Sequence, residues 1–195
     1  MSNIKPAIIA ICGAAASGKD TLLYHLAPAL GATKIISDTT RPKRPGEYEG
    51  IDYHYISVTQ FANNIEDDRY LEYSVFRHWF YGTPKDAICG KVNIGVFNMS
   101  GILSLLEYQD DYNIYPILLK TNPIVRLKRY IHRDGKFRLE CLRRLWVDFE
   151  QFADAENLLK YKVPQHLVLK NFDVKQNLDD LTQYLVSEPL SAYYQ

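Results

Sequence analysis

Residues 7–21 read AIIAICGAAASGKDT, and this stretch decides the fold. Its second part has the spacing GxxxxGK, with glycines at positions 13 and 18 and a lysine at position 19. Small residues at this spacing let a run of backbone N–H groups close around a polyphosphate, while the lysine reaches the outer phosphates. The spacing predicts a nucleoside triphosphate site formed by Gly13, Ala14, Ala15, Ala16, Ser17, Gly18, Lys19, Asp20 and Thr21.

The flanks of this loop have the sequence patterns that a phosphate-binding loop requires. Residues 7–12 form a short apolar run, which is typical of a strand covered on both faces. After the loop, leucines recur at the spacing of one helix face, at Leu22, Leu23, Leu26 and Leu30. Free N–H groups and the helix dipole at a helix N-terminus favour bound phosphate. The stretch therefore predicts a P-loop α/β protein.

The residue after Lys19 is unusual for this motif. A serine or threonine normally follows the lysine and places its hydroxyl on Mg²⁺, whereas this chain has Asp20. Since Mg²⁺ prefers hard oxygen ligands and keeps several waters, one hypothesis is that Asp20 holds the metal directly or through water. The alternative is that Asp20 caps the helix beginning beside it, where a negative charge is favourable. Both interpretations stay open at this point.

Composition and charge narrow the function classes. The 195 residues suit one α/β domain, and 23 Lys and Arg balance 23 Asp and Glu, which argues against nonspecific nucleic-acid binding. The cysteines, at 12, 89 and 141, are far apart, and the five histidines show no ligand spacing, so we expect reduced thiols and no zinc site. The start of the chain has no apolar run long enough for a signal peptide or membrane span. We expect a cytoplasmic monomer or homodimer without a membrane partner.

Strands alternate with helices along most of the remaining chain, which predicts a parallel sheet flanked by helices. We expect strands at 34–37, 92–97, 113–119 and 166–170, and helices at 84–88, 102–108, 123–133, 135–161 and 174–185. Residues 38–83 interrupt this pattern. Their prolines, glycines and alternating tyrosines predict a small antiparallel sheet, with a helix at 58–65 and strands at 71–76 and 79–82.

The interrupting segment carries residues suited to a second anion. Arg41 and Arg44 lie three apart in a proline-restrained stretch, and Tyr53 follows after a short loop. Guanidinium groups bind phosphate oxygens bidentately, and tyrosine hydroxyls add neutral donors. These residues alone are also compatible with a solvated basic turn.

Ordered blocks of this segment resemble the acceptor lobe of guanylate kinases. The blocks are SDTTRPKRPGEYEGIDYHYIS at 37–57, YLEYSVF at 70–76 and FYGTPK at 80–85. With the phosphate loop and the arginine-rich stretch near 126–144, the resemblance spans nearly the whole chain. It implies a P-loop kinase that transfers the γ-phosphoryl group of ATP to GMP or dGMP with Mg²⁺. It also implies a single domain with a core at 1–37, 84–128 and 163–187, an acceptor-binding lobe at 38–83 and a helical lid at about 129–162.

The resemblance also assigns roles to individual residues. It implies that the acceptor phosphate binds Arg41, Arg44, Tyr53 and Tyr81, and that Ser37, Glu72, Thr83 and the position of Asn98 face the base. Guanine offers N1–H and its 2-amino group together to a carboxylate such as Glu72, whereas adenine would leave that carboxylate unpaired. Lid arginines that close over the transferring phosphates correspond to Arg129, Arg133 and Arg144, which we group with Lys19 as catalytic, while Asn171 corresponds to a donor-adenine contact. We expect Arg126 and Arg143 to be merely solvated.

Two departures from the family pattern leave alternatives open. The DxDxxG element of guanylate kinases is VFNMSG here, so that Val96 and Asn98 stand at the aspartate positions. SGKD together with an NxS element is similar to ribose 1,5-bisphosphate kinases, whose acceptor has no base. Against that reading, Glu72 and Thr83 would have no purpose without a base. A noncatalytic guanylate-kinase-like binding module is a further alternative, although such modules typically lack the phosphate loop that is present here.

Overall fold

A five-stranded parallel sheet forms the centre of the protein. The computed structural model describes residues 5–76, 78–134, 143, 146, 152, 155–162, 166–169 and 174–187. The central sheet has the order β2-β7-β1-β8-β9, and every neighbouring pair in it is parallel. Its strands are β1 (Ala7–Cys12), β2 (Thr33–Lys34), β7 (Val92–Val96), β8 (Asn113–Leu119) and β9 (Leu167–Leu169). The predicted parallel α/β sheet is confirmed.

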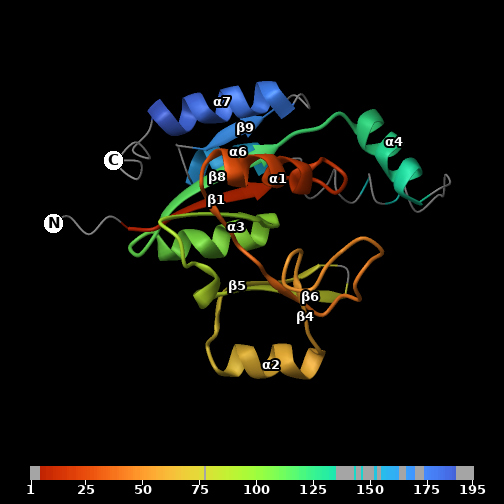
Figure 1. The fold of residues 1–195 in the computed structure, drawn as a ribbon, viewed down its shortest axis with the longest axis vertical. Helices are drawn as coiled ribbons and strands as arrows, with labels where there is room; N and C mark the ends of the chain where they lie inside the picture. The colour runs from red at the N-terminus through yellow and green to blue at the C-terminus, as the bar shows by residue number, and fades with distance from the viewer. Residues whose placement is uncertain are drawn as a thin grey trace.

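Helices cover both faces of this sheet (Figure 1). On one face, the side chains of Ile9 and Ile11 pack with leucines of α1 (Lys19–Ala29) and α7 (Val174–Ser187). On the other face, Ile8 and Ala10 pack with α3 (Met99–Leu105) and α6 (Ala155–Lys162). Successive residues of β1 thus enter opposite cores, and all six of them are buried. This double burial explains why the strand is apolar throughout.

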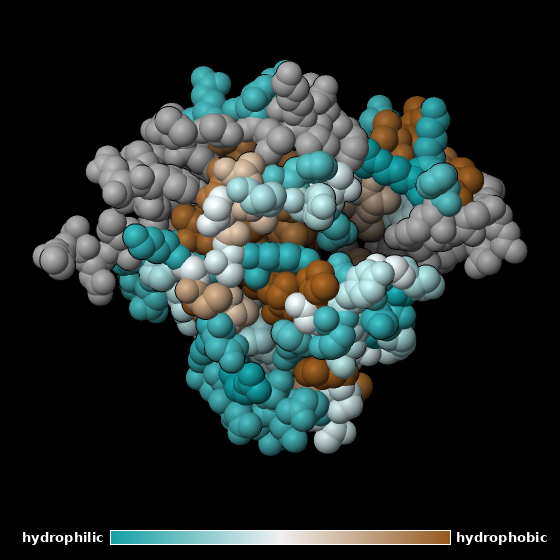
Figure 2. Space-filling view, in the orientation of Figure 1, coloured by the Kyte–Doolittle hydropathy of each residue, from teal (hydrophilic) through white to brown (hydrophobic). Residues whose placement is uncertain are grey.

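A second sheet forms a lobe below the central sheet in Figure 1. Its order is β4-β3-β6-β5, and α2 packs against it through Phe61, which stacks on Tyr70. Ser57 caps α2 by accepting a hydrogen bond from the backbone N–H of Gln60. The outer side of α2 is hydrophilic (Figure 2). The lobe comprises β3 (Asp38–Thr39), β4 (His54–Tyr55), α2 (Val58–Glu66), β5 (Tyr70–Phe76) and β6 (Trp79–Pro84).

The connections differ from the predicted pattern in three places. The strand expected at 34–37 pairs in the sheet only as β2, because the chain then leaves the core for the lobe. The helix expected at 84–88 is one 3₁₀ turn, η1 (Lys85–Ala87). β4 runs parallel to β3, so a purely antiparallel lobe is wrong. A hairpin turn would reverse the chain, whereas the long loop at 40–53 returns β4 in the same direction.

Helices also follow β7 and β8, the two strands that pair with the central β1. After β7, α3 continues into the 3₁₀ turn η2 (Leu106–Tyr108), and after β8 the chain enters α4 (Pro123–Asp134), which extends away from the sheet in Figure 1. The long helix expected at 135–161 lies largely outside the described residues. The loop after β1, the start of α3 and the lobe therefore surround the carboxyl ends of the central strands, the usual ligand site of open α/β sheets.

Candidate active site

Backbone geometry shapes the loop between β1 and α1 for phosphate binding. A Cβ on Gly13 would lie 2.5 Å from the carbonyl oxygen of Leu119, so only glycine lets β1 and β8 approach this closely. Gly18 precedes α1 with φ 102°, a conformation that favours glycine. The Lys19 Nζ donates to the carbonyl oxygens of Gly13 at 2.8 Å and Ala14 at 3.0 Å. Its ammonium group is thereby held over the loop.

Two arginines of α4 hold the loop from outside. Arg126 Nε donates to the carbonyl oxygen of Ala15 at 2.9 Å, and Arg129 Nη1 donates to those of Ala16 at 3.1 Å and Ser17 at 2.8 Å. Arg126 is buried, so the expectation that it is merely solvated is wrong. A loop whose N–H groups face one way leaves carbonyl oxygens that need donors on the other side. Arg143 is exposed.

Asp20 lies in the first turn of α1 and faces the cavity next to the loop. Gly18 occupies the capping position, and no side chain makes a capping hydrogen bond there. The capping interpretation of Asp20 is therefore wrong, because the residue lies inside the helix and not in front of it. An exposed carboxylate at this position suits both the helix dipole and a hydrated cation. The metal interpretation stays a prediction.

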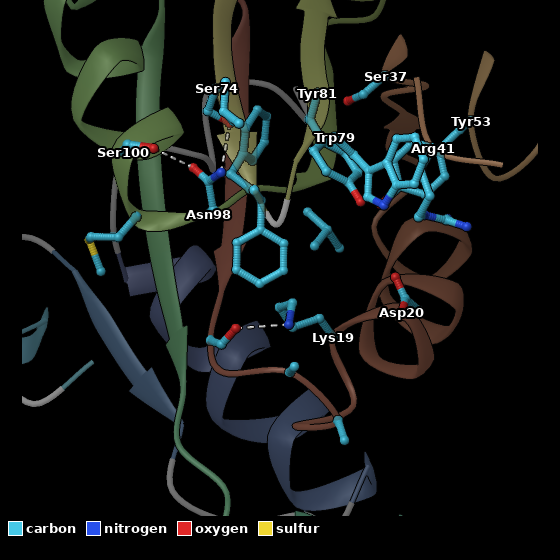
Figure 3. A pocket seen from close by; sticks show the side chains of 18 of the residues that line it. Lys19, Asp20, Ser37, Arg41, Tyr53, Ser74, Trp79, Tyr81, Asn98 and Ser100 are labelled. Carbon is cyan, nitrogen blue, oxygen red and sulfur yellow. Dashed lines mark hydrogen bonds between the residues drawn. The ribbon is translucent and has the colours of Figure 1, made fainter. Parts of the chain in front are cut away.

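One cavity of about 570 Å³ joins the phosphate loop to the lobe. Figure 3 shows Lys19 and Asp20 across this cavity from Arg41, Tyr53, Tyr81 and Asn98. Phosphate-loop and lobe residues that are distant in sequence thus meet at one site. The predicted residues that line the cavity are Gly13, Ala15, Ala16, Lys19, Asp20, Ser37, Arg41, Arg44, Tyr53, Glu72, Tyr81 and Asn98.

Glu47 holds the arginine that was expected to bind the acceptor phosphate. Its two carboxylate oxygens each accept a hydrogen bond of 2.9 Å from the buried Arg41 guanidinium. It also accepts hydrogen bonds from the backbone N–H of Arg44 and from Tyr55 Oη. Burial would raise the pKa of Glu47, but these bonds and the Arg41 charge outweigh it and lower the pKa to about 2. Glu47 belongs to the quoted GEYEG block, yet its sequence position did not reveal this role.

Replacing Glu47 by glutamine is expected to raise the KM for the acceptor about tenfold with a smaller change in kcat. Glutamine keeps the size of the side chain but removes the charge that orients Arg41, and a charge-assisted hydrogen bond contributes about 1.5–3 kcal/mol. Steady-state kinetics would measure the effect. Glu49→Gln is the matched control, because Glu49 is an exposed neighbour that bonds His54 and the Tyr55 backbone instead. Equal KM changes in both variants would contradict the assignment.

A buried hydrogen-bonded chain lies at the inner end of the cavity. Thr83 Oγ1 donates to Glu72 Oε1 at 2.7 Å, and the Ser37 and Thr83 hydroxyls are 3.3 Å apart. Burial raises the pKa of Glu72 to about 7, with the Thr83 hydrogen bond opposing part of that shift. The Glu72 carboxylate can accept hydrogen bonds from the polar edge of a ring, and the Ser37 and Thr83 hydroxyls can accept or donate.

The raised pKa of Glu72 predicts a pH-dependent loss of stability. The folded state holds the Glu72 proton more tightly than the unfolded state, so protonation of Glu72 adds to the free energy of unfolding. This stabilisation is fully present below pH 4.5 and is lost as the pH rises to about 7. The difference between 4.5 and about 7 corresponds to about 3 kcal/mol. Urea unfolding at pH 5 to 8 should therefore show Glu72→Gln gaining stability over the natural protein as pH rises. The exposed Glu66→Gln should show no such trend, and a trend equal in both would refute the effect.

Asn98 is part of the framework at the start of α3. Its Oδ1 accepts from the backbone N–H of Gly101 at 2.7 Å and from Ser100 Oγ at 2.9 Å, and its Nδ2 donates to Ser74 Oγ at 2.7 Å. The wall of the cavity near Asn98 also contains apolar side chains that were not among the predicted site residues. Val96, at the other aspartate position of the family element, also lines the cavity, and the lining residues that the sequence did not single out are Ser74, Val75, Phe76, Trp79, Phe97, Met99, Ser100, Tyr130 and Phe152.

The other predicted site residues fall into three groups. Thr83 touches the site through Glu72, and Arg129 through the loop carbonyl oxygens. Ala14, Ser17, Gly18 and Thr21 lie in the loop or at the start of α1. Arg144 and Asn171 lie outside the described residues, as does the side chain of Arg133.

Several other features bear on the classes of site. Within the described part of the chain, no group of three or more His, Cys, Asp or Glu side chains is placed to bind a metal. None of the helices described has the length and apolar character needed to cross a membrane. Cys12 is a buried free thiol and Cys89 an exposed one.

Comparison with known proteins places this site in a family. The family model for guanylate kinase matches residues 5–96. Guanylate kinase of Blochmanniella floridana is 30% identical over 188 residues, which cover 92% of this chain and 85% of that protein. The chain belongs to the guanylate kinase family. Guanylate kinase of Maricaulis maris is 28% identical over 94% of this chain and 84% of its own length.

Solved structures show the same fold. The crystal structure of guanylate kinase from Anaplasma phagocytophilum superposes with a TM-score of 0.67 and covers 96% of this chain and 88% of its own, at 18% sequence identity. The fold of the guanylate kinase family thus extends over both the central sheet and the lobe. The resemblance found in the sequence blocks is confirmed.

Proposed function

We propose that the protein transfers the γ-phosphoryl group of ATP to GMP or dGMP. The observation that carries this proposal is the single cavity that joins Lys19 on the phosphate loop to Arg41, Tyr81 and Glu72 on the lobe. Membership in the guanylate kinase family supports the same reaction. One end of the cavity suits a triphosphate, and the other suits a monophosphate with a base that offers two adjacent N–H groups.

The reaction requires positioning and charge stabilisation more than covalent help from the protein. Lys19 would neutralise charge on the outer phosphates of ATP, while Arg41 and Arg44 hold the acceptor phosphate in line with them. We propose that Arg129, Arg133 and Arg144 belong to a lid at about 129–162 that closes over the core and the acceptor lobe at 38–83. Small-angle scattering that shows no compaction when both nucleotides bind would contradict this closure.

Magnesium would bind beside the phosphate loop. When bound, the ion would neutralise phosphate charge, and Asp20 is the carboxylate that this chain offers to hold it directly or through water. We expect Asp20→Ala to raise the Mg²⁺ concentration for half-maximal activity about tenfold, roughly the effect of losing one charged ligand contact. Titration of activity with Mg²⁺ at fixed ATP measures this. Asp52→Ala in the lobe is the control, and an unchanged Mg²⁺ requirement for Asp20→Ala would rule out the role.

A sugar-phosphate kinase is the main competing function. Its acceptor would have no base, but this chain buries a carboxylate with two hydroxyls at the end of the cavity. Burying such groups without a ligand to recognise is costly. The test offers GMP, dGMP and ribose 1,5-bisphosphate with ATP, and turnover of the sugar phosphate alone would refute the proposal. A binding module without activity would turn over none of the three.

The cellular setting follows from the same proposal. ATP and a guanine nucleotide are the proposed partners, with no nucleic acid or membrane. The exposed free thiol of Cys89 suits a reducing compartment, so we place the enzyme in the cytoplasm.

A further inference from the structure

We propose that the protein also phosphorylates nucleotides of hypoxanthine bound in the acceptor site. Hypoxanthine is the 6-oxopurine that lacks the 2-amino group of guanine. This inference rests on the proposed function and names a wider substrate class for the same site. It comes from the hydrogen bonds of Asn98, which leave the site with one carboxylate to recognise that amino group.

Hydrogen bonding fixes the orientation of the Asn98 amide. The backbone N–H of Gly101 can only donate, so the atom facing it at 2.7 Å is the amide oxygen Oδ1. The same oxygen accepts from Ser100 Oγ, so both of its lone pairs are in use. The nitrogen Nδ2 donates to Ser74 Oγ, as Figure 3 shows. An amide nitrogen cannot accept a hydrogen bond, and Asn98 therefore has no acceptor left for a purine amino group.

Asn98 lies beside the proposed base-reading carboxylate. A Cβ built on Gly101 would lie 2.7 Å from Glu72 Oε2 and 3.2 Å from Asn98 Oδ1, so both oxygens flank the same point of α3. Both side chains also line the cavity. A purine edge that reaches Glu72 therefore passes next to Asn98. An aspartate at position 98 could cap α3 with one oxygen and offer the other to the base, which Asn98 cannot do.

This arrangement lowers the cost of losing the 2-amino group. Guanine can direct N1–H and the amino group to Glu72, whereas hypoxanthine retains N1–H and the 6-oxo group. Hypoxanthine leaves the buried Glu72 carboxylate with one N–H partner in place of two. Because Ser74, Ser100 and Gly101 already satisfy Asn98, hypoxanthine leaves no polar atom of Asn98 unpaired. A site rejects an analogue strongly only when the missing group leaves buried partners unsatisfied. The site should therefore accept IMP and dIMP, and should discriminate against them less than a site in which a second carboxylate also reads the amino group.

The experiment compares kcat/KM for GMP and IMP, with ATP as donor, in the natural protein, Asn98→Asp and Asn63→Asp. Asn98→Asp retains a good helix cap, and Asn63→Asp makes the same chemical change on the exposed side of α2. We expect IMP turnover by the natural protein and a GMP-to-IMP ratio that rises about tenfold or more in Asn98→Asp. Asn63→Asp should keep the natural ratio. Comparing ratios removes any general effect of the added charge.

Two results would overturn the inference. One is GMP turnover without measurable IMP turnover in the natural protein, a result that does not depend on any variant folding. The other is an unchanged GMP-to-IMP ratio in Asn98→Asp that has a natural melting temperature. A natural protein that phosphorylates neither GMP nor IMP would instead refute the proposed function, so the two failures are distinguishable.

Discussion

Replacing Lys19 by alanine is expected to lower kcat for phosphoryl transfer by at least about 10²–10³-fold, the usual cost of removing one preorganised charge-stabilising group. The Lys19 ammonium is held over the phosphate loop by the carbonyl oxygens of Gly13 and Ala14. No other lysine lines the cavity among the described residues, so alanine would leave the outer phosphates without this charge. Steady-state kinetics with saturating ATP and GMP would measure the loss.

The control for this change is Lys91→Ala, an exposed lysine before β7 that does not line the cavity. Thermal unfolding of both variants would separate lost chemistry from lost folding, because the Lys19 side chain also bonds the loop. Activity of Lys19→Ala within a few-fold of the natural protein would contradict the catalytic role. It would also favour the noncatalytic binding module.

The second large effect is expected for Glu72→Gln, which should lower kcat/KM for GMP by about 10²–10³-fold. A carboxylate accepts both N–H groups of the guanine edge, whereas an amide accepts one and sets a donor against the other. Glutamine preserves the volume of the side chain and can still accept the Thr83 hydrogen bond. The loss of activity should therefore come with equal or greater stability at neutral pH.

Glu66→Gln is the matched control for this prediction, since Glu66 is exposed at the end of α2. It should leave kcat/KM for GMP unchanged. A Glu72→Gln enzyme that phosphorylates GMP as well as the natural protein does would show that Glu72 does not read the base. Loss of activity together with a lower melting temperature would point to a structural role instead.

Local patterns were enough to predict the core of the fold. The expected strands at 7–12 and 113–119 coincide with β1 and β8, and α4 differs from its expected range by one residue. Strands buried on both faces must be apolar along their whole length, so their ends are marked by the first polar or glycine residue. The phosphate loop could also be predicted from the sequence, because its backbone conformation requires glycines at a fixed spacing that few other sequences have.

The lobe and the α4 arginines were less predictable for a physical reason. β4 lies parallel to β3 because of the path of the long loop between them. Strands of two residues are too short to have a sequence pattern from which their relative direction could be predicted. Arg126 is buried because loop carbonyl oxygens far away in the sequence need donors. Glu47 likewise acquires its role from the place where Arg41 lies in the folded lobe.

Positions 98 and 20 also separate what the sequence determined from what only the folded structure determined. Motif spacing placed the Asp20 carboxylate near phosphate, and the resemblance to guanylate kinases implied that Asn98 replaces a carboxylate near the base. Only folding showed that Asn98 is saturated by Ser74, Ser100 and Gly101, and that Asp20 lies within α1 facing the cavity. Spacing specifies a residue's chemistry and its local backbone, whereas hydrogen-bond partners come from segments that meet only when the chain packs.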